Sequence, residues 1–209
     1  SAASDVYKRQ PVESVAADLI AKKWGLVKDS YVLFLGRIVP EKGVHYLIDA
    51  FKRLDTGKRL VIAGGASDSA EYYESVRKAA GSDPRIVLAG FTQGAELAEL
   101  YSNAYAYVLP SDLEGMPMSL LEALSYGNCC LTSDIPECAD VLRGEDGVMH
   151  GVTFREGDVD DLAARLQELL DHPDTVAAFG KDAAAYVTGR YNWDAITRQT
   201  LNTYKGEDQ

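Results

Sequence analysis

The sequence has little cysteine, no long apolar run and fewer basic than acidic residues. Cys129, Cys130 and Cys138 have the spacing of neither a disulfide framework nor a metal site, which indicates a reducing, cytoplasmic compartment and no bound metal. The longest apolar stretches, such as Tyr31–Leu35, fall far short of the roughly 18–20 residues that span a bilayer, so no transmembrane segment is expected. A formal net charge of −11 argues against a nucleic-acid partner, which would need a basic face.

The composition is that of an ordinary globular protein, with 209 residues, 46% hydrophobic and 25% charged. Its charge is unevenly distributed along the chain. Residues 1–58 contain ten Lys/Arg and seven Asp/Glu, whereas residues 59–209 contain eleven and twenty-five. An anionic ligand is therefore expected near the front of the chain.

Residues 1–10 have neither an apolar core nor a periodic pattern, so they are interpreted as a non-native leader. Residues 11–209 are interpreted as a single domain, because no internal repeat or low-complexity linker interrupts them. An amphipathic stretch predicts a first helix over Val12–Trp24, ended by Gly25.

Short apolar runs rich in β-branched residues then alternate with helical patterns. Because the runs are continuous, they are typical of strands buried on both faces of a parallel sheet. The predicted strands are Tyr31–Leu35, Arg59–Ala63, Arg85–Ala89, Tyr105–Leu109 and Cys129–Thr132. The predicted helices are Val44–Leu54, Ala70–Ala80, Ala95–Ser102, Met118–Tyr126, Asp158–Leu170 (stopped at His172-Pro173), Thr175–Thr188 and Trp193–Tyr204. This alternation predicts an α/β fold: a Rossmann-like, doubly wound parallel sheet with helices on both faces and C-terminal helices.

The first predicted strand runs into a loop that carries two cations, Gly36-Arg37-Ile38-Val39-Pro40-Glu41-Lys42-Gly43. The loop matches neither the dinucleotide-binding G-x-G-x-x-G pattern nor a P-loop. Arg37 can offer a planar fork to phosphate oxygens and Lys42 a mobile point charge, next to glycines and the N-terminus of a helix. The loop therefore suits a diphosphate; alternatively, both are solvated surface cations, as most Lys and Arg are.

Two glutamates lie eight residues apart after the strand that ends at Leu109. Glu114 falls in the loop before a predicted helix, and Glu122 lies one to two turns inside that helix, whose first turn suits Pro117. Carboxylates accept hydrogen bonds from pairs of hydroxyls, and N–H groups at a helix start can hold a phosphate, so a polyhydroxylated ligand could bridge the two. The alternative is one acid that stabilises the helix dipole and one unrelated surface glutamate.

Five segments in the same order along the chain form a larger pattern. They are G-R-I-V-P-E-K-G at Gly36–Gly43, V-I-A-G-G at Val61–Gly65, V-L-A-G-F at Val87–Phe91, L-P-S-D-L-E-G-M-P-M-S-L-L-E-A-L at Leu109–Leu124 and Y-N-W at Tyr191–Trp193. The pattern covers the chain from about residue 29 to 204 and resembles the C-terminal, donor-binding domain of GT-B glycosyltransferases of the retaining family 4 (glycosyl transferases group 1). The E-x7-E spacing of the two glutamates is its most recognisable feature.

The resemblance implies a role for each matching residue. Arg37 and Lys42 would neutralise the donor's diphosphate and stabilise the leaving nucleoside diphosphate, Glu114 would contact the transferred sugar, and Glu122 would hold the ribose hydroxyls. The implied donor-binding residues, among which the pair at 90 and 91 would line the base site, are Gly36, Gly64, Gly65, Gly90, Phe91, Gly115, Met116, Pro117, Met118, Ser119 and Leu120. No metal is implied.

The resemblance further implies transfer of a hexosyl group from a nucleotide sugar, such as a UDP- or GDP-sugar, to a saccharide, lipid or other hydroxyl acceptor, with retention of configuration and without a cofactor. A complete GT-B enzyme binds its acceptor through an N-terminal domain, which we expect to be absent here, so the isolated domain is expected to be inactive. The expected localisation is cytoplasmic. The alternative is that the full-length enzyme associates peripherally with a membrane. Alternatives are a non-catalytic nucleotide-sugar-binding module and a GT-B epimerase or phosphorylase.

Overall fold

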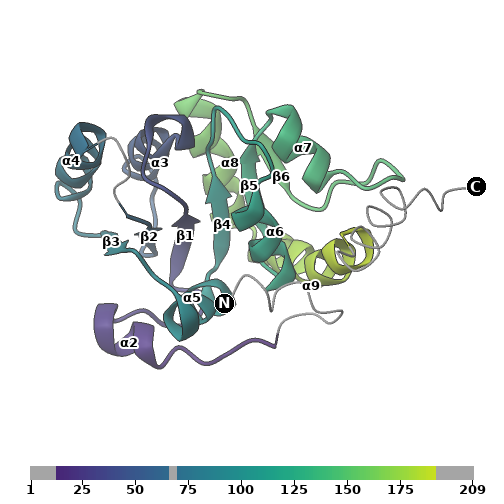
Figure 1. The fold of residues 1–209 in the computed structure, drawn as a ribbon, viewed down its shortest axis with the longest axis horizontal. Coiled ribbons are helices and arrows are strands. Elements are labelled where there is room, and N and C mark those ends of the chain that lie inside the picture. The colour runs from purple at the N-terminus through teal and green to yellow at the C-terminus, as the bar shows by residue number, and fades with distance from the viewer. Residues whose placement is uncertain (1–12, 66–69, 192–209) are drawn as a thin grey trace, which may run out of the picture.

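The computed structural model describes residues 13–65 and 70–191, and a parallel sheet forms its centre (Figure 1). Within these residues the sheet has six strands in the order β3-β2-β1-β4-β5-β6, and every neighbouring pair is parallel. The strands are β1 (Tyr31–Leu35), β2 (Arg59–Ala63), β3 (Ile86–Gly90), β4 (Ala106–Leu109), β5 (Cys130–Ser133) and β6 (Val152–Phe154).

Helices cover both faces of the sheet (Figure 1). Helix α3 contacts α4 and α8, whereas α2 contacts α5 and α6 contacts α9. The helices are α2 (Leu19–Trp24), the 3-10 helix η1 (Pro40–Lys42), α3 (Val44–Phe51), α4 (Ala70–Ala80), α5 (Gly94–Asn103), α6 (Met118–Ser125), α7 (Pro136–Leu142), α8 (Val159–Asp171) and α9 (Pro173–Arg190).

The strand order places a switch point between β1 and β4. The chain moves outward from β1 through β2 to β3, and then crosses back to pair β4 with the other side of β1. The loops that follow β1 and β4 therefore diverge toward opposite halves of the sheet. In open α/β sheets, ligands bind in the crevice that this divergence leaves at the carboxyl ends of the strands.

The burial of the central strands explains why they could be predicted from the sequence. Four residues of β1 and all four of β4 are buried, because helices cover both faces of the sheet at its centre. The α/β prediction with a doubly wound sheet is confirmed. The observed bounds of β1, β2 and α4 equal the predicted ones, β4 begins one residue later than predicted, and β3 and β5 are each shifted by one residue toward the C-terminus.

Strand β6 and helix α7 were not predicted. Both are short, with three and seven residues, so neither is long enough to give a periodic pattern. Pro173, predicted to end α8, also begins α9, where its missing N–H costs nothing. The predicted leader at residues 1–10 and the predicted helix Trp193–Tyr204 lie outside the described residues.

The first helix begins later than predicted, at Leu19 instead of Val12. The N–H groups of Leu19 and Ile20 donate to the Glu99 carboxylate of α5, at 2.7 and 3.0 Å. Glu99 is 6% exposed, and it satisfies the N–H groups at the start of α2 from a neighbouring helix. The helix start thus depends on a residue 80 positions away, which local periodicity does not reveal.

Gly43 brings the loop after β1 against the loop after β4, and we expect Gly43→Ala to be strongly destabilising. Gly43 has a φ of +61°, and a Cβ atom there would lie 1.9 Å from the Pro110 carbonyl oxygen. The clash adds to the roughly 1–2 kcal/mol of a left-handed conformation, so the free energy of unfolding should fall by about 2–4 kcal/mol. Urea denaturation measures this loss.

Gly94→Ala is the matched control, because Gly94 also has a φ of +61° but has no atom within 4 Å of an added Cβ. It should lose only the roughly 1–2 kcal/mol of the left-handed conformation. Equal losses in the two variants would show that the contact between the two loops adds nothing to stability.

Candidate functional site

A small pocket of about 130 Å³ lies at the carboxyl ends of β1, β2 and β3. It is lined by Leu35, Gly36, Arg37, Ala63, Gly64, Gly65, Phe91 and Thr92. The fold therefore brings together five of the residues that the sequence assigned to the donor site, from three separate loops. Gly90 directly precedes this set, and its carbonyl accepts a hydrogen bond from the Gly64 N–H at 2.8 Å.

Close backbone contact shapes the floor of this pocket. A Cβ at position 64 would lie 1.9 Å from the Gly36 carbonyl oxygen, so only glycine allows the loops after β1 and β2 to approach this closely. Phe91 lines the same pocket and is 74% exposed. Its ring thus offers an open apolar surface beside a backbone-lined recess.

An ion pair between Lys42 and Glu114 spans the switch point. Lys42 ends η1 after β1, Glu114 follows β4, and Nζ lies 2.6 Å from Oε1. Their side chains are only 16% and 5% exposed. Ser111 Oγ donates to the same oxygen at 2.7 Å, and Ser133 Oγ donates to the Ser111 carbonyl at 2.5 Å. The carboxylate is therefore held through one oxygen, and no donor in the described chain reaches Oε2.

Arg37, the other cation predicted to bind phosphate, differs from Lys42 in its surroundings. Arg37 is exposed and lines the pocket, and it forms no hydrogen bond or ion pair with any residue in the described ranges. Lys42 has its charge balanced by Glu114, so Arg37 supplies the uncompensated positive charge of the predicted pair. A planar guanidinium in this state can offer a two-pronged contact to phosphate oxygens.

Glu122 lies inside α6, and among the described residues its carboxylate has one hydrogen-bond partner, a tyrosine. The Tyr101 hydroxyl donates to Glu122 Oε2 at 3.1 Å. Burial raises the pKa of Glu122, and the Tyr101 hydrogen bond partly opposes that rise. The Tyr107 hydroxyl donates to Ser119 Oγ at 2.8 Å and lies 3.3 Å from the Leu35 carbonyl oxygen. These contacts place the first turn of α6 beside the end of β1.

The backbone at the start of α6 is partly engaged by itself. Pro117 has φ −76° and ψ 76°, the geometry of an inverse γ-turn, and the Met118 N–H donates to the Met116 carbonyl at 2.8 Å. The Leu120 N–H donates to the Pro117 carbonyl at 3.0 Å. Within the described residues the Ser119 N–H has no acceptor. Fewer backbone N–H groups of Gly115–Leu120 are therefore available to a ligand than the sequence predicted.

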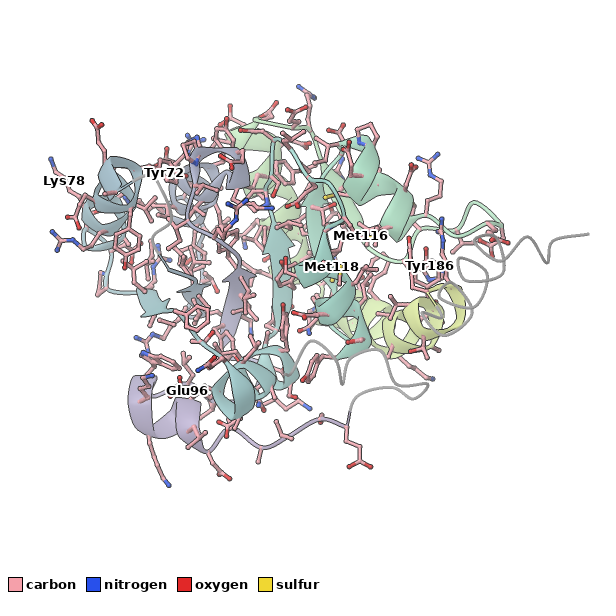
Figure 2. The ribbon with its side chains drawn as sticks, in the orientation of Figure 1. Tyr72, Lys78, Glu96, Met116, Met118 and Tyr186 are labelled. Carbon is pink, nitrogen blue, oxygen red and sulfur yellow. The ribbon has the colours of Figure 1, made fainter. Side chains whose placement is uncertain are left out.

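The N-terminus of α3 is covered by a side chain. The Tyr72 hydroxyl of α4 accepts from the His45 N–H at 3.4 Å and lies 2.8 Å from His45 Nδ1 (Figure 2). Burial lowers the pKa of His45 and raises the pKa of Tyr72 to about 12. The neutral Tyr72 side chain thus lies at the N-terminus of α3, which the sequence analysis had assigned to diphosphate binding.

Four hydrogen-bonding residues of the site were not recognised in the sequence: Ser111, Ser133, Tyr101 and Tyr107. Ser111 stands three residues before Glu114, and this spacing was the available signal. Tyr107 lies within the apolar run of β4 and Tyr101 follows Leu100 on α5, so both are typical of core residues. Among the described residues, no group of three or more His, Cys, Asp or Glu side chains is placed to hold a metal, and no helix has the length and apolar content needed to cross a bilayer.

We expect Lys42→Met to lower the free energy of unfolding by about 2–4 kcal/mol, because it leaves the buried Glu114 carboxylate without its counter-charge. The double variant Lys42→Met/Glu114→Gln should recover part of this loss. Chemical denaturation of the two variants and the wild type measures both effects.

Arg77→Met is the control for the ion pair, because Arg77 pairs with Glu74 at 2.7 Å while both side chains are more than half exposed. Its effect should stay within about 0.5 kcal/mol. A loss of the same size in Lys42→Met would contradict the view that the Lys42–Glu114 pair stabilises the site.

We expect Glu122→Gln to stabilise the protein at pH 7 and to leave stability unchanged at about pH 3. Because burial raises the pKa of Glu122 in the folded state, ionising it costs stability as pH rises through the unfolded and then the folded pKa. Glutamine removes that cost and still accepts from Tyr101. Thermal melts across this pH range measure the difference, and a Gln variant that is less stable at pH 7 would contradict the prediction.

The described architecture matches known proteins of one kind. Residues 17–186 match the family model "Glycosyl transferases group 1". The chain is 28% identical over 178 residues to an uncharacterised glycosyltransferase of Methanocaldococcus jannaschii (85% of this chain, 45% of the relative). It is 26% identical over 207 residues to O-antigen chain mannosyltransferase B of Escherichia coli (97% and 52%).

Solved structures show the same fold. Anabaena Alr3699/HepE in complex with UDP and glucose superposes with a TM-score of 0.83 at 19% identity, covering 97% of this chain and 54% of that one. The chain spans about half the length of the curated relatives it matches. Because the family model covers most of the sequence, this chain belongs to the glycosyl transferases group 1 family.

Proposed function

We propose that this chain is the donor-binding half of a retaining GT-B glycosyltransferase of family 4. It binds a nucleoside-diphosphate sugar at the carboxyl edge of the sheet and supports hexosyl transfer to a hydroxyl acceptor. The observation that carries this proposal is the 2.6 Å contact between Lys42 and Glu114, because Lys42 belongs to the same loop after β1 as Gly36 and Arg37 of the pocket. A nucleotide sugar joins its diphosphate directly to its sugar, so a phosphate-binding cation and a sugar-binding carboxylate must be neighbours.

The two cations stabilise the leaving group. As the bond between the sugar C1 and the diphosphate oxygen breaks, negative charge develops on the phosphate, and fixed positive groups lower the energy of that state. Lys42 has three N–H donors, of which Glu114 occupies one, so two can point to phosphate oxygens. Arg37 binds the diphosphate from the side of the pocket at the ends of β1, β2 and β3.

Glu114 binds the transferred sugar through Oε2, because Lys42 and Ser111 both hold Oε1. A carboxylate so neutralised and anchored is suited to orienting a sugar hydroxyl and poorly suited to acting as a nucleophile. In the proposed reaction the acceptor oxygen attacks C1 from the face that the diphosphate leaves. The acceptor proton passes to the departing phosphate oxygen, and configuration is retained.

Similar proteins support glycosyl transfer from a nucleotide sugar. The similar proteins include an O-antigen mannosyltransferase and, at 30% identity over 184 residues, alpha-maltose-1-phosphate synthase of Mycobacterium tuberculosis (83% of this chain, 47% of the relative). The Anabaena neighbour holds UDP and glucose. We assign acceptor binding to a further domain of the kind that fills the other half of such proteins, so the isolated chain should bind donor without transferring sugar.

We expect the chain to bind at least one of UDP, GDP and ADP in isothermal titration calorimetry, more tightly than the matching monophosphate. Arg37→Met should weaken the diphosphate about tenfold, because it removes a charge-assisted hydrogen bond of about 1.5 kcal/mol. Arg77→Met, an exposed arginine on α4, should leave binding unchanged.

Absence of binding by all three diphosphates would contradict the donor site. Equal weakening in Arg37→Met and Arg77→Met would show a general charge effect and would remove Arg37 from the site.

A further inference from the structure

Tyr101 connects α5 to the carboxylate in the middle of α6. Its side chain is 1% exposed, and its hydroxyl donates to Glu122 Oε2 at 3.1 Å and lies 3.3 Å from the Ser119 carbonyl oxygen. The ring stacks on Tyr126 with centroids 5.2 Å apart and an interplanar angle of 16°. Packing therefore leaves the hydroxyl little freedom to move away from Glu122.

Glu122 is held on one side only. Tyr101 is its sole side-chain hydrogen-bond partner among the described residues, and it engages Oε2. Oε1 is left without a donor from this part of the chain. A half-buried carboxylate gains much from further donors, because its remaining lone pairs are partly shielded from water.

We propose that Tyr101 is a positioning residue for nucleotide recognition: its buried hydroxyl orients Glu122 so that Oε1 accepts hydrogen bonds from the ribose 2′ and 3′ hydroxyls. This inference rests on the proposed function, and it adds a residue outside the E-x7-E segment to the donor site. The substrate feature that it reads is the ribose diol, independent of the base and of the transferred sugar.

A purely structural role for Tyr101 makes a different prediction. If the hydroxyl served only to satisfy a buried carboxylate, its loss would lower stability and would weaken all nucleotides alike. If it orients the ribose-binding oxygen, its loss weakens only ligands that carry the ribose hydroxyls. The ratio of two dissociation constants within one variant separates these cases, because a general loss of stability or site integrity cancels in the ratio.

The test compares the diphosphate that the wild type binds most tightly, taken as UDP below, with its 2′,3′-dideoxy form by calorimetry on the full chain. For the wild type we expect the dideoxy ligand to bind about tenfold more weakly, as for a charge-assisted hydrogen bond. In Tyr101→Phe the ratio should fall to about two through weaker UDP binding. Tyr105→Phe is the matched control: it removes another buried tyrosine hydroxyl, which donates to the Leu169 carbonyl at 2.7 Å, and it should keep the wild-type ratio.

Glu122→Gln provides a second route that does not depend on the folding of Tyr101→Phe. The ratio should fall in Glu122→Gln, and the double variant should show no additional fall. A wild-type ratio in either single variant would overturn the inference, as would a wild type that binds UDP and the dideoxy ligand equally well. If the wild type binds neither UDP nor GDP nor ADP, the donor-site proposal itself fails, and that result is distinguishable from the others.

Discussion

The contact between the loops after β1 and β4 determines the shape of the candidate site. The Lys42–Glu114 ion pair joins them, the Asp112 N–H donates to the Glu41 carbonyl at 2.9 Å, and Gly43 packs directly on Pro110. Charge, backbone hydrogen bonding and steric fit thus act on the same few residues. Because these loops follow the neighbouring strands β1 and β4, their contact holds Lys42 and Glu114 at the carboxyl ends of the central strands, where open α/β sheets bind ligands.

The charge at the site is set by the Lys42–Glu114 ion pair more than by the net positive charge of residues 1–58. The front of the chain has an excess of cations, but Lys58 and Arg59 bind the backbone carbonyls of Asp29 and Trp24, away from the pocket. Lys42 is balanced by Glu114, which leaves Arg37. In the proposed function, a diphosphate would therefore be bound through a few directed contacts rather than through a broad positive field, consistent with an acidic protein.

Continuous apolar runs were enough to predict the sheet, because β1, β2 and β4 are buried on both faces and carry no alternation to confuse the pattern. The same reasoning could not find β6, whose three residues carry too little pattern. The sequence motifs identified the charged residues of the candidate site but not the side chains that hydrogen-bond to them. That Glu114 binds Lys42 and Glu122 binds Tyr101 depends on strand order and helix packing, which bring together residues 72 and 21 positions apart.

The two glutamates of one short motif are therefore not equivalent. Glu114 meets a cation and a serine, so its charge is balanced before any ligand arrives. Among the described residues, the Glu122 carboxylate contacts only the neutral hydroxyl of Tyr101, and burial raises its pKa. A carboxylate left short of donors costs stability in the empty protein. In the proposed function, hydrogen bonds from the ribose hydroxyls would recover that cost when the ligand binds. Glu114, in the loop before α6, thus joins two loops through its Oε1, whereas Glu122, inside α6, is not part of that contact.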